Sequence, residues 1–335
     1  MLRIGVIGCG PMGINHIQRI TERIQGACVT AVSNRTRAHA EEAARIAGGT
    51  RIYDNGTELI NDPEVDAVLI ASAGFLHTQD LLEAIRAGKR VFCEKPLFTT
   101  EEDCRTVMEA EMKTGRHLIQ VGFCRRYYTG YRQLKEAVET GKYGEPLMIH
   151  MTHRAQRVAL TYDTPMMVHD TCVHDLDICH WMLGEAYDSV QVFYPKETKN
   201  THPGLRDPQL MMLRTKSGVL IDVEVNVNCS FGYDMNMEVI CEDASLKMGM
   251  PIAPEIKTDA RKEREIPVHH FVLFAEAFDA EIQDWVDHAA DDRITGPDTW
   301  DGYFAAVTCD ALVRAQETGL PEPVCTMEKP AFYMK

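Results

Sequence analysis

The sequence predicts an α/β protein: an N-terminal doubly wound parallel sheet, followed by a C-terminal α+β domain built on a mostly antiparallel open sheet. Strand-like and helix-like segments alternate in the first third of the chain, and a glycine pattern follows the first strand. Successive strand-like segments then occur without helices between them. Because 335 residues are too many for one ordinary core, we expect two domains, residues 1–123 and 124–335.

The first domain is expected to consist of βα units joined by short loops. Residues 67–71 read Ala-Val-Leu-Ile-Ala, a wholly apolar run that is typical of a parallel strand buried on both faces. Such units connect through right-handed crossovers. The expected strands are residues 2–7, 27–32, 50–53, 67–71, 90–93 and 117–121, and the expected helices are about 12–23, 37–47, 78–87 and 101–114.

After Phe123 the pattern becomes rich in strands. A turn at 216–218, Lys-Ser-Gly, separates two strand-like segments and predicts a hairpin. Helices are expected at about 130–140, 272–289 and 303–317. The expected strands are 146–152, 189–194, 209–215, 219–228, 234–241 and 244–247.

Charge and composition exclude several classes of partner. A formal net charge of −15 argues against binding to nucleic acid or to an anionic membrane surface. No apolar run reaches the roughly 18 residues that a membrane span needs, and a strand starting at residue 2 leaves no room for a signal peptide. Eleven scattered cysteines suggest reduced thiols, so we expect a cytoplasmic protein.

The glycine pattern Gly8-x-Gly10-x-x-Gly13 lies between the first strand and the first helix, as a dinucleotide-binding loop requires. Gly8 allows the tight turn, Gly10 lets the backbone approach a pyrophosphate, and Gly13 lets the helix pack against the strand. The pyrophosphate, with Met12 beside it, would lie at the helix N-terminus, where the helix dipole favours an anion. The alternative is a glycine-rich turn that binds nothing.

The end of the second strand indicates which dinucleotide binds. An acidic residue at this place binds the ribose of NAD, but the chain has Asn34, followed by Arg35, Thr36 and Arg37. Asn34 would not repel a 2′-phosphate, and a neighbouring arginine could pair with it. We therefore favour NADP, with NAD as the alternative if the arginines are only solvated surface residues.

Lys95, in Cys-Glu-Lys-Pro at 93–96, directly follows a predicted parallel strand. Ligands of open α/β sheets bind beyond the carboxyl ends of the strands, so we expect Lys95 and the adjacent Glu94 at the cofactor crevice. A single lysine is more often a solvated surface group, and only this position favours a chemical role. Pro96 fixes the local backbone and permits a cis peptide bond before it.

A second group of ionisable residues occupies 168–181. On an α-helix, Asp170, His174 and Asp177 fall at i, i+4 and i+7 and therefore share one face. Such a face suits a pocket that binds hydroxyl groups and moves a proton, whereas the plain alternative is a solvated polar face. The other histidines and cysteines of this segment spread around the helix, so no metal site is expected.

These motifs together resemble the glucose–fructose oxidoreductase, inositol dehydrogenase and rhizopine catabolism family. The resemblance covers essentially the whole chain and is closest to the bacterial inositol dehydrogenases. It rests on the glycine pattern, on Glu94-Lys95-Pro96 and on Asp170-x-x-x-His174. Further matching stretches are 120–127, 144–150, 207–209, 231–234 and 296–303.

The resemblance implies a role for each matching residue. Lys95 would contact and polarise the reacting hydroxyl, His174 would take its proton, and Asp170 would orient His174. Glu94 and Lys95 would also contact the cofactor. The other residues implied to line a polyol pocket are Arg125, His153, Asp177 and Tyr233.

The implied activity is hydride transfer between an inositol hydroxyl, in the myo or scyllo isomer, and a nicotinamide cofactor, which gives an inosose. The resemblance also implies a homotetramer, and an open sheet face is commonly buried by oligomerisation. The alternatives are a dehydrogenase of pyranose sugars and a non-catalytic regulator that binds a dinucleotide and a sugar. Ala73, Ala155 and His270 stand where inositol dehydrogenases carry Trp, Asn and Trp, which changes the predicted pocket.

Overall fold

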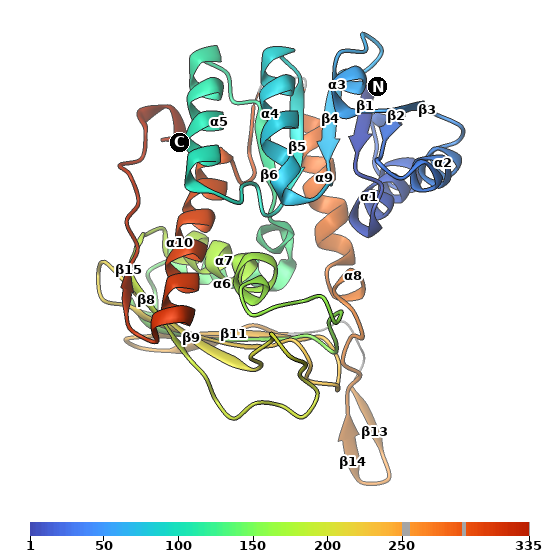
Figure 1. Ribbon diagram of the computed structural model, residues 1–335. Helices are drawn as coiled ribbons and strands as arrows, with labels where there is room; N and C mark the ends of the chain where they lie inside the picture. The colour runs from blue at the N-terminus through green and yellow to red at the C-terminus, as the bar shows by residue number, and fades with distance from the viewer. Residues whose placement is uncertain (250–254, 290–292, 335) are drawn as a thin grey trace. The chain divides into compact units, whose positions relative to one another are not determined.

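A computed structural model describes residues 1–249, 255–289 and 293–334. The chain forms two compact units (Figure 1). The first contains Met1–Cys124, Phe278–Ala306 and Met327–Lys335, and the second contains Arg125–Ala277 and Val307–Thr326. The chain therefore passes from the first unit to the second at residue 124, returns at 278, and crosses twice more before it ends. None of the described helices is both long and apolar enough to cross a membrane.

The first unit contains the expected parallel sheet, with the strand order β3-β2-β1-β4-β5-β6. The order runs outward from β1 to one edge and from β4 to the other, as a doubly wound sheet requires. The strands are β1 Leu2–Ile7, β2 Ala27–Ser33, β3 Arg51–Tyr53, β4 Ala67–Ile70, β5 Arg90–Glu94 and β6 Ile119–Gly122. The helices between them are α1 Pro11–Glu22, α2 Arg37–Ile46, α3 Gly56–Ile60, α4 His77–Arg86 and α5 Glu101–Thr114, with the 3₁₀ turn η1 at Gly74–Leu76.

Apolar strands and the inner faces of helices form the core of the first unit. Residues of β1, β2, β4 and β5 pack with the inner side of α1. Helix α9 (Ala275–Ala289) adds Ile282, Trp285 and Val286 to the same cluster, so a helix far along the chain completes this core. The end of the chain also belongs here, because the hydroxyl of Tyr333 donates a hydrogen bond to the buried carboxylate of Glu111 at 2.8 Å.

The second unit is built on a seven-stranded sheet in the order β12-β11-β7-β10-β9-β8-β15. Helices α6 and α7 lie on one side of it (Figure 1). Its strands are β7 Pro146–Arg154, β8 Tyr187–Phe193, β9 Gln209–Thr215, β10 Leu220–Asn226, β11 Asp234–Cys241, β12 Ser245–Lys247 and β15 Glu322–Pro323. Its helices are α6 Thr129–Glu139, α7 Val173–Leu183, α8 His270–Leu273 and part of α10 Thr299–Thr318, and a small hairpin is formed by β13 Ile256–Thr258 and β14 Arg261–Glu263. The 3₁₀ turn η2 Cys124–Tyr127 lies where the chain enters this unit, whereas the 3₁₀ turn η4 Ala331–Tyr333 belongs to the first unit.

The sheet is mixed, as one parallel pair interrupts the expected antiparallel pattern. β8, β9 and β10 form an antiparallel meander with the predicted hairpin between β9 and β10. β7, which comes earlier in the chain, lies parallel beside β10 and antiparallel to β11. Along β7, β10 and β11 buried and half-exposed residues alternate, so one face of the sheet is buried and the other is partly open.

Several helical segments differ from expectation. The helix expected at 272–289 is divided into α8 and α9, and the last helix begins at Thr299 instead of 303. The segment expected to continue a regular α-helix through Asp170 is instead a π-helix, η3 (Met167–Cys172), that becomes α-helical at Val173. A π-helical turn within an α-helix is rare and is found frequently at functional sites.

Candidate active site

The loop between β1 and α1 has the geometry of a pyrophosphate cradle. Gly8 has φ +93°, and a Cβ on Gly13 would lie 1.9 Å from the carbonyl oxygen of Gly8. At Gly10, no atom of the described residues lies within 4 Å of where a Cβ would be, so the space beside the helix N-terminus is open. No side chain caps α1, which leaves its first N–H groups available to an anion. These features fit a bound dinucleotide.

Asn34 ties the end of β2 to this loop. Its Oδ1 accepts a hydrogen bond from the Cys9 N–H at 2.9 Å, and its Nδ2 donates to the Thr36 carbonyl at 3.0 Å. Arg35 and Thr36 are exposed. Arg37 forms ion pairs with two nearby carboxylates. Arg35 is therefore the arginine of this segment that has the greater freedom to contact a 2′-phosphate.

Lys95 lies at the carboxyl end of β5, where the sequence places it. The five residues of β5 are buried, whereas Lys95 is half-buried and the Lys95–Pro96 peptide bond is cis. His77 supports this turn from below: its Nδ1 lies 3.0 Å from the Pro96 carbonyl and its Nε2 lies 3.0 Å from the Ser72 carbonyl. Burial lowers the pKa of His77, and a neutral imidazole can donate a hydrogen bond to only one of these two carbonyls.

In the second unit, Asp170 and His174 lie on either side of the π-to-α transition. Asp170 is exposed and His174 is half-buried, but Asp177, one α-turn further, is buried. The three residues therefore do not form the uniformly accessible polar face that α-helical spacing predicts. Asp177 accepts a hydrogen bond from Nε of Arg126 at 3.0 Å, so its carboxylate is engaged by an arginine of the same unit.

Arg125, His153 and Tyr233 meet around Asp175, which is not one of the residues predicted from the sequence motifs. Asp175 is fully buried; it forms an ion pair with the Arg125 guanidinium, and its Oδ2 lies 2.7 Å from His153 Nδ1. The hydroxyl of Tyr233 lies 3.2 Å from Nε2 of His153. Burial raises the pKa of Asp175, but Arg125 and then His153 outweigh it and hold that pKa below its ordinary value.

The contacts around Asp175 could not be predicted from the sequence motif. Asp175 follows His174 directly, so it points about 100° around the helix and into the interior. Arg125 comes from the turn after β6, and His153 and Tyr233 come from β7 and the residue before β11. Only the tertiary fold brings them together, and spacing in the sequence carries no signal of it. Arg125 and His153 are 1% and 3% exposed, so they support the site from within.

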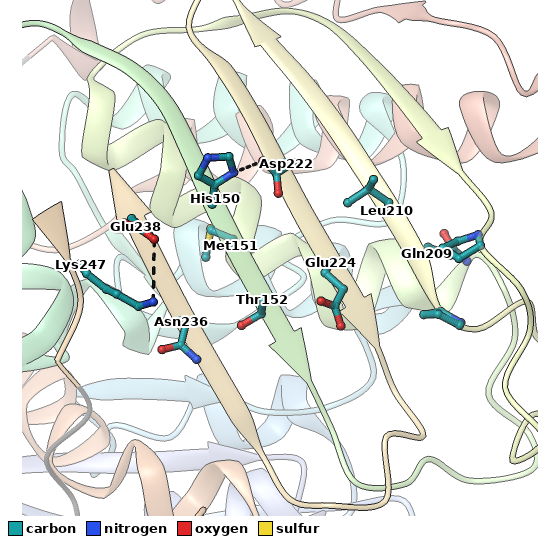
Figure 2. A pocket seen from close by; sticks show the side chains of 12 residues that line it. His150, Met151, Thr152, Gln209, Leu210, Asp222, Glu224, Asn236, Glu238 and Lys247 are labelled. Atoms are coloured by element: carbon teal, nitrogen blue, oxygen red, sulfur yellow. Dashed lines mark hydrogen bonds and ion pairs between the residues drawn. The ribbon is translucent and has the colours of Figure 1, made fainter. Parts of the chain in front are cut away.

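A depression of about 470 Å³ lies on the opposite, partly open face of the second sheet (Figure 2). His150 and Thr152 point into it from β7, whereas His153 lies on the buried face of the same strand. Because adjacent strand residues point to opposite faces, this depression is separate from the group around Asp175. Its other lining residues include Asp222, Glu224, Asn236 and Glu238.

The parallel sheet and its glycine loop define a protein that binds a dinucleotide through a Rossmann domain. Comparison with known families agrees and is more specific. Residues 2–123 match the oxidoreductase family with an NAD-binding Rossmann fold, and residues 131–247 match the GFO/IDH/MocA C-terminal domain. The chain belongs to the GFO/IDH/MocA oxidoreductase family.

Individual relatives are similar over their full length. An inositol 2-dehydrogenase of Burkholderia ambifaria is 46% identical over 99% of both chains. An inositol 2-dehydrogenase/D-chiro-inositol 3-dehydrogenase of Shouchella clausii is 45% identical over 99% of this chain and 96% of its own. The crystal structure of myo-inositol dehydrogenase from Lactobacillus casei, in complex with NAD(H) and myo-inositol, superposes with a TM-score of 0.97 at 36% identity and full coverage of both chains.

Proposed function

We propose that this protein is an inositol dehydrogenase, which oxidises one hydroxyl of a cyclic polyol to a ketone. The proposal rests on full-length similarity to an inositol 2-dehydrogenase: the two sequences are 46% identical over 99% of each chain. Lys95, Asp170 and His174 support it, because a regulator that only binds sugar and dinucleotide needs no residues that move a proton.

Each of these side chains has a role that fits its chemistry. A bound nicotinamide would supply the acceptor for the hydride that leaves the carbon carrying the reacting hydroxyl. His174 accepts the proton of that hydroxyl, and Asp170 stabilises the imidazolium so formed. Lys95 donates a hydrogen bond to the same oxygen and stabilises its developing negative charge. Arg125, His153, Asp177 and Tyr233 are proposed to form the buried inner wall of the polyol pocket, with Asp175 holding Arg125 and His153 in place.

We propose NADP as the preferred cofactor, with NAD as the alternative. The amide oxygen of Asn34 accepts a hydrogen bond from the Cys9 N–H in the loop between β1 and α1, and it places no negative charge beside the ribose. The exposed Arg35 can pair with a 2′-phosphate. The other residues of the cofactor site are Gly8, Gly10, Met12, Gly13, Thr36, Glu94 and Lys95.

Initial rates test substrate and cofactor together. The purified protein is assayed with myo-inositol, scyllo-inositol and D-glucose, each with NAD and with NADP, by absorbance of the reduced nicotinamide. We expect fast oxidation of an inositol, faster with NADP than with NAD. Turnover restricted to glucose would instead identify a pyranose dehydrogenase, and dinucleotide binding without turnover of any pair would identify a regulator.

We also propose that the protein is a cytoplasmic homotetramer that works on a small polyol, with no nucleic acid or membrane as partner. All eleven cysteines are free thiols and only Cys325 is exposed, which is usual for a protein of a reducing compartment. The partly open face of the second sheet is the surface that we expect the subunits to share (Figure 2).

A further inference from the structure

Three acid–base side chains lie together in the core of the first unit; only Glu94 among them belongs to the proposed cofactor site, and none has a proton-transfer role in the proposed reaction. They are His16 on α1, Glu94 at the end of β5 and Glu281 on α9, with exposed fractions of 0%, 6% and 0%. One nitrogen or oxygen of each lies within 4.8 Å of the others. His16 Nε2 and Glu94 Oε1 are 2.6 Å apart and form a direct hydrogen bond.

Glu281 is the unusual member of this cluster. Among the described residues, neither of its carboxylate oxygens has a hydrogen-bond partner, and neither does Nδ1 of His16. The aromatic rings of Phe92 and Phe278 pack edge-on against His16 at 5.5 and 6.1 Å between centroids, so the surroundings are apolar. An ionised carboxylate without a partner is among the most costly groups to bury.

The charged groups that face Glu281 do not remove this cost. From α1, Arg19 favours the ionised form, but its guanidinium already pairs with Asp279 of α9. From β5, Glu94 opposes ionisation, and from β6 the Gln120 amide donates to the backbone carbonyl of Glu281 at 3.4 Å. Burial, followed by the charge of Glu94, raises the pKa of Glu281 well above its ordinary value.

Glu94 connects this cluster to the proposed active site. Its Oε1 is bound to His16, and its Oε2 accepts a hydrogen bond from the backbone N–H of Lys95 at 3.2 Å. Gly122 of β6 gives it room, because a Cβ there would lie 3.1 Å from the Glu94 carboxylate. The Glu94 carboxylate thus joins the helix that follows the dinucleotide loop to the backbone of Lys95.

We propose that Glu281 is a neutral carboxylic acid whose O–H completes the His16–Glu94 hydrogen-bond network, and that it is a positioning residue for Lys95 through Glu94. The gap of at most 4.8 Å between these atoms has to close by side-chain rotation for the bond to form, and the bond would satisfy an oxygen of Glu281 without burying a second charge. The effect on catalysis rests on the role proposed for Lys95, whereas the protonation of Glu281 does not.

Infrared spectroscopy tests the protonation on the intact protein. At pH 7, the spectrum of wild type minus Glu281→Gln should contain the carbonyl stretch of one protonated carboxylic acid. That band should persist to a higher pH than the acid bands of exposed glutamates. A carboxylate band in its place, or one tightly bound divalent metal per chain by elemental analysis, would show that another cation neutralises the cluster and would overturn the proposal.

Kinetics and stability test the positioning role. Glu281→Gln has the shape of the neutral acid and can donate a hydrogen bond, so it should keep kcat within about threefold. Glu281→Leu cannot donate, and we expect its kcat to fall by about tenfold or more while its dinucleotide Kd stays within about twofold. Equal losses of kcat in both variants would contradict the proposal.

A pH series separates proton binding from simple packing. Folded wild type holds a proton on Glu281 that the unfolded chain releases above its ordinary pKa, so wild-type stability should decrease as the pH rises. Glu281→Gln has no such proton to lose. The Tm of this variant minus the Tm of wild type should therefore increase between pH 6 and pH 8. A Tm difference independent of pH would refute the neutral acid. If Lys95→Ala retained turnover, the role proposed for Lys95 would be wrong. The infrared band and the pH dependence of Tm would still test the protonation of Glu281.

Discussion

His174 and Lys95 carry the chemistry that we propose, and removing each should affect turnover more than cofactor binding. His174→Ala removes the proton acceptor, and we expect kcat to fall by about 10²–10⁴-fold. Lys95→Ala removes the cation that stabilises the developing charge, with a loss of similar size. Both are measured by initial rates, with dinucleotide Kd from the quenching of tryptophan fluorescence.

His180→Asn is the matched control for this experiment. His180 is a half-buried histidine on the same helix as His174, and its Nδ1 lies 2.8 Å from the Glu185 carbonyl. Its replacement should leave kcat within about threefold of wild type, since an amide side chain keeps a donor for that carbonyl. Near-wild-type turnover of His174→Ala would remove His174 from the mechanism.

Asn34→Asp tests cofactor choice with a minimal change of shape. The new carboxylate still accepts the hydrogen bond from the Cys9 N–H, but it cannot replace the hydrogen bond that Asn34 Nδ2 donates to the Thr36 carbonyl. Its negative charge repels a 2′-phosphate, and we expect the ratio of kcat/KM for NADP to that for NAD to fall by about tenfold or more. Arg35→Ala should weaken NADP alone. An unchanged ratio in both variants would place the 2′-phosphate contact elsewhere.

Asp80 is a residue whose ionisation should oppose folding. Burial raises its pKa from 3.8 to about 6, so the native state binds a proton that the unfolded state has already released. The destabilisation is absent below about pH 4 and complete above about pH 6. Asp80→Asn should therefore add about 1–2 kcal/mol to the free energy of unfolding at pH 8, allowing for the partial exposure of Asp80.

Denaturant titrations of wild type and Asp80→Asn at several pH values provide the measurement. The difference in unfolding free energy should shrink as the pH is lowered from 8 toward 4, because protonated aspartic acid and asparagine are both neutral. A constant difference, or one that grows in acid, would show that Asp80 is stabilised as a carboxylate.

At the scale of an element, two glycines of the β1–α1 turn are expected to have different roles: Gly13 in folding and Gly10 in cofactor binding. A Cβ on Gly13 would collide with the carbonyl oxygen of Gly8, so Gly13→Ala should destabilise the protein itself. A Cβ on Gly10 meets no atom of the described chain within 4 Å. Gly10→Ala should therefore keep the wild-type Tm without cofactor but raise the dinucleotide Kd by about tenfold or more, as the methyl group fills the pyrophosphate space.

Thermal melts with and without dinucleotide distinguish the two cases. Gly10→Ala should lose the stabilisation that the cofactor gives, whereas Gly13→Ala should melt lower in both conditions. If Gly10→Ala bound the cofactor as tightly as wild type, the loop would not be the pyrophosphate site.

The first unit was largely predictable because its signals are local. An apolar run such as Ala67–Ile70 and the glycine spacing each identify an element without knowledge of its neighbours. Helix α9 was predicted as a helix, but its membership of the first core depends on contacts of Ile282 and Trp285 with strands more than 190 residues earlier. No local pattern encodes such a contact.

The second unit shows where local patterns fail. The α-helical period put Asp170, His174 and Asp177 on one face, but the π-helix η3 shifts Asp170 relative to the residues that follow. The parallel pairing of β7 with β10 was also missed, because hairpin signals identify strands that are adjacent in sequence and cannot place one that is not.

At the scale of the whole molecule, a chain with a net charge of −15 must limit repulsion where copies meet. The open face of the second sheet meets this condition, since its acidic groups are paired within the same chain. Asp222 pairs with His150, and Glu238 with Lys247 at 3.8 Å. Arg154 is shared by Glu224 and Asp234. These pairs reduce the negative charge of the face but do not cancel it, because one arginine serves two carboxylates and His150 compensates Asp222 only when it is protonated.

Light scattering coupled to size exclusion tests the tetramer that we propose. Wild type should have four times the 37.7 kDa mass of the chain. Leu210→Glu adds an unpaired charge to the depression and should produce smaller species, whereas Leu320→Glu changes a 63% exposed leucine outside it and should remain tetrameric. A monomeric wild type would refute the tetramer. A tetramer that Leu210→Glu leaves intact would place the interface on another surface, because a buried, unpaired carboxylate at a subunit contact costs more than most interfaces can tolerate.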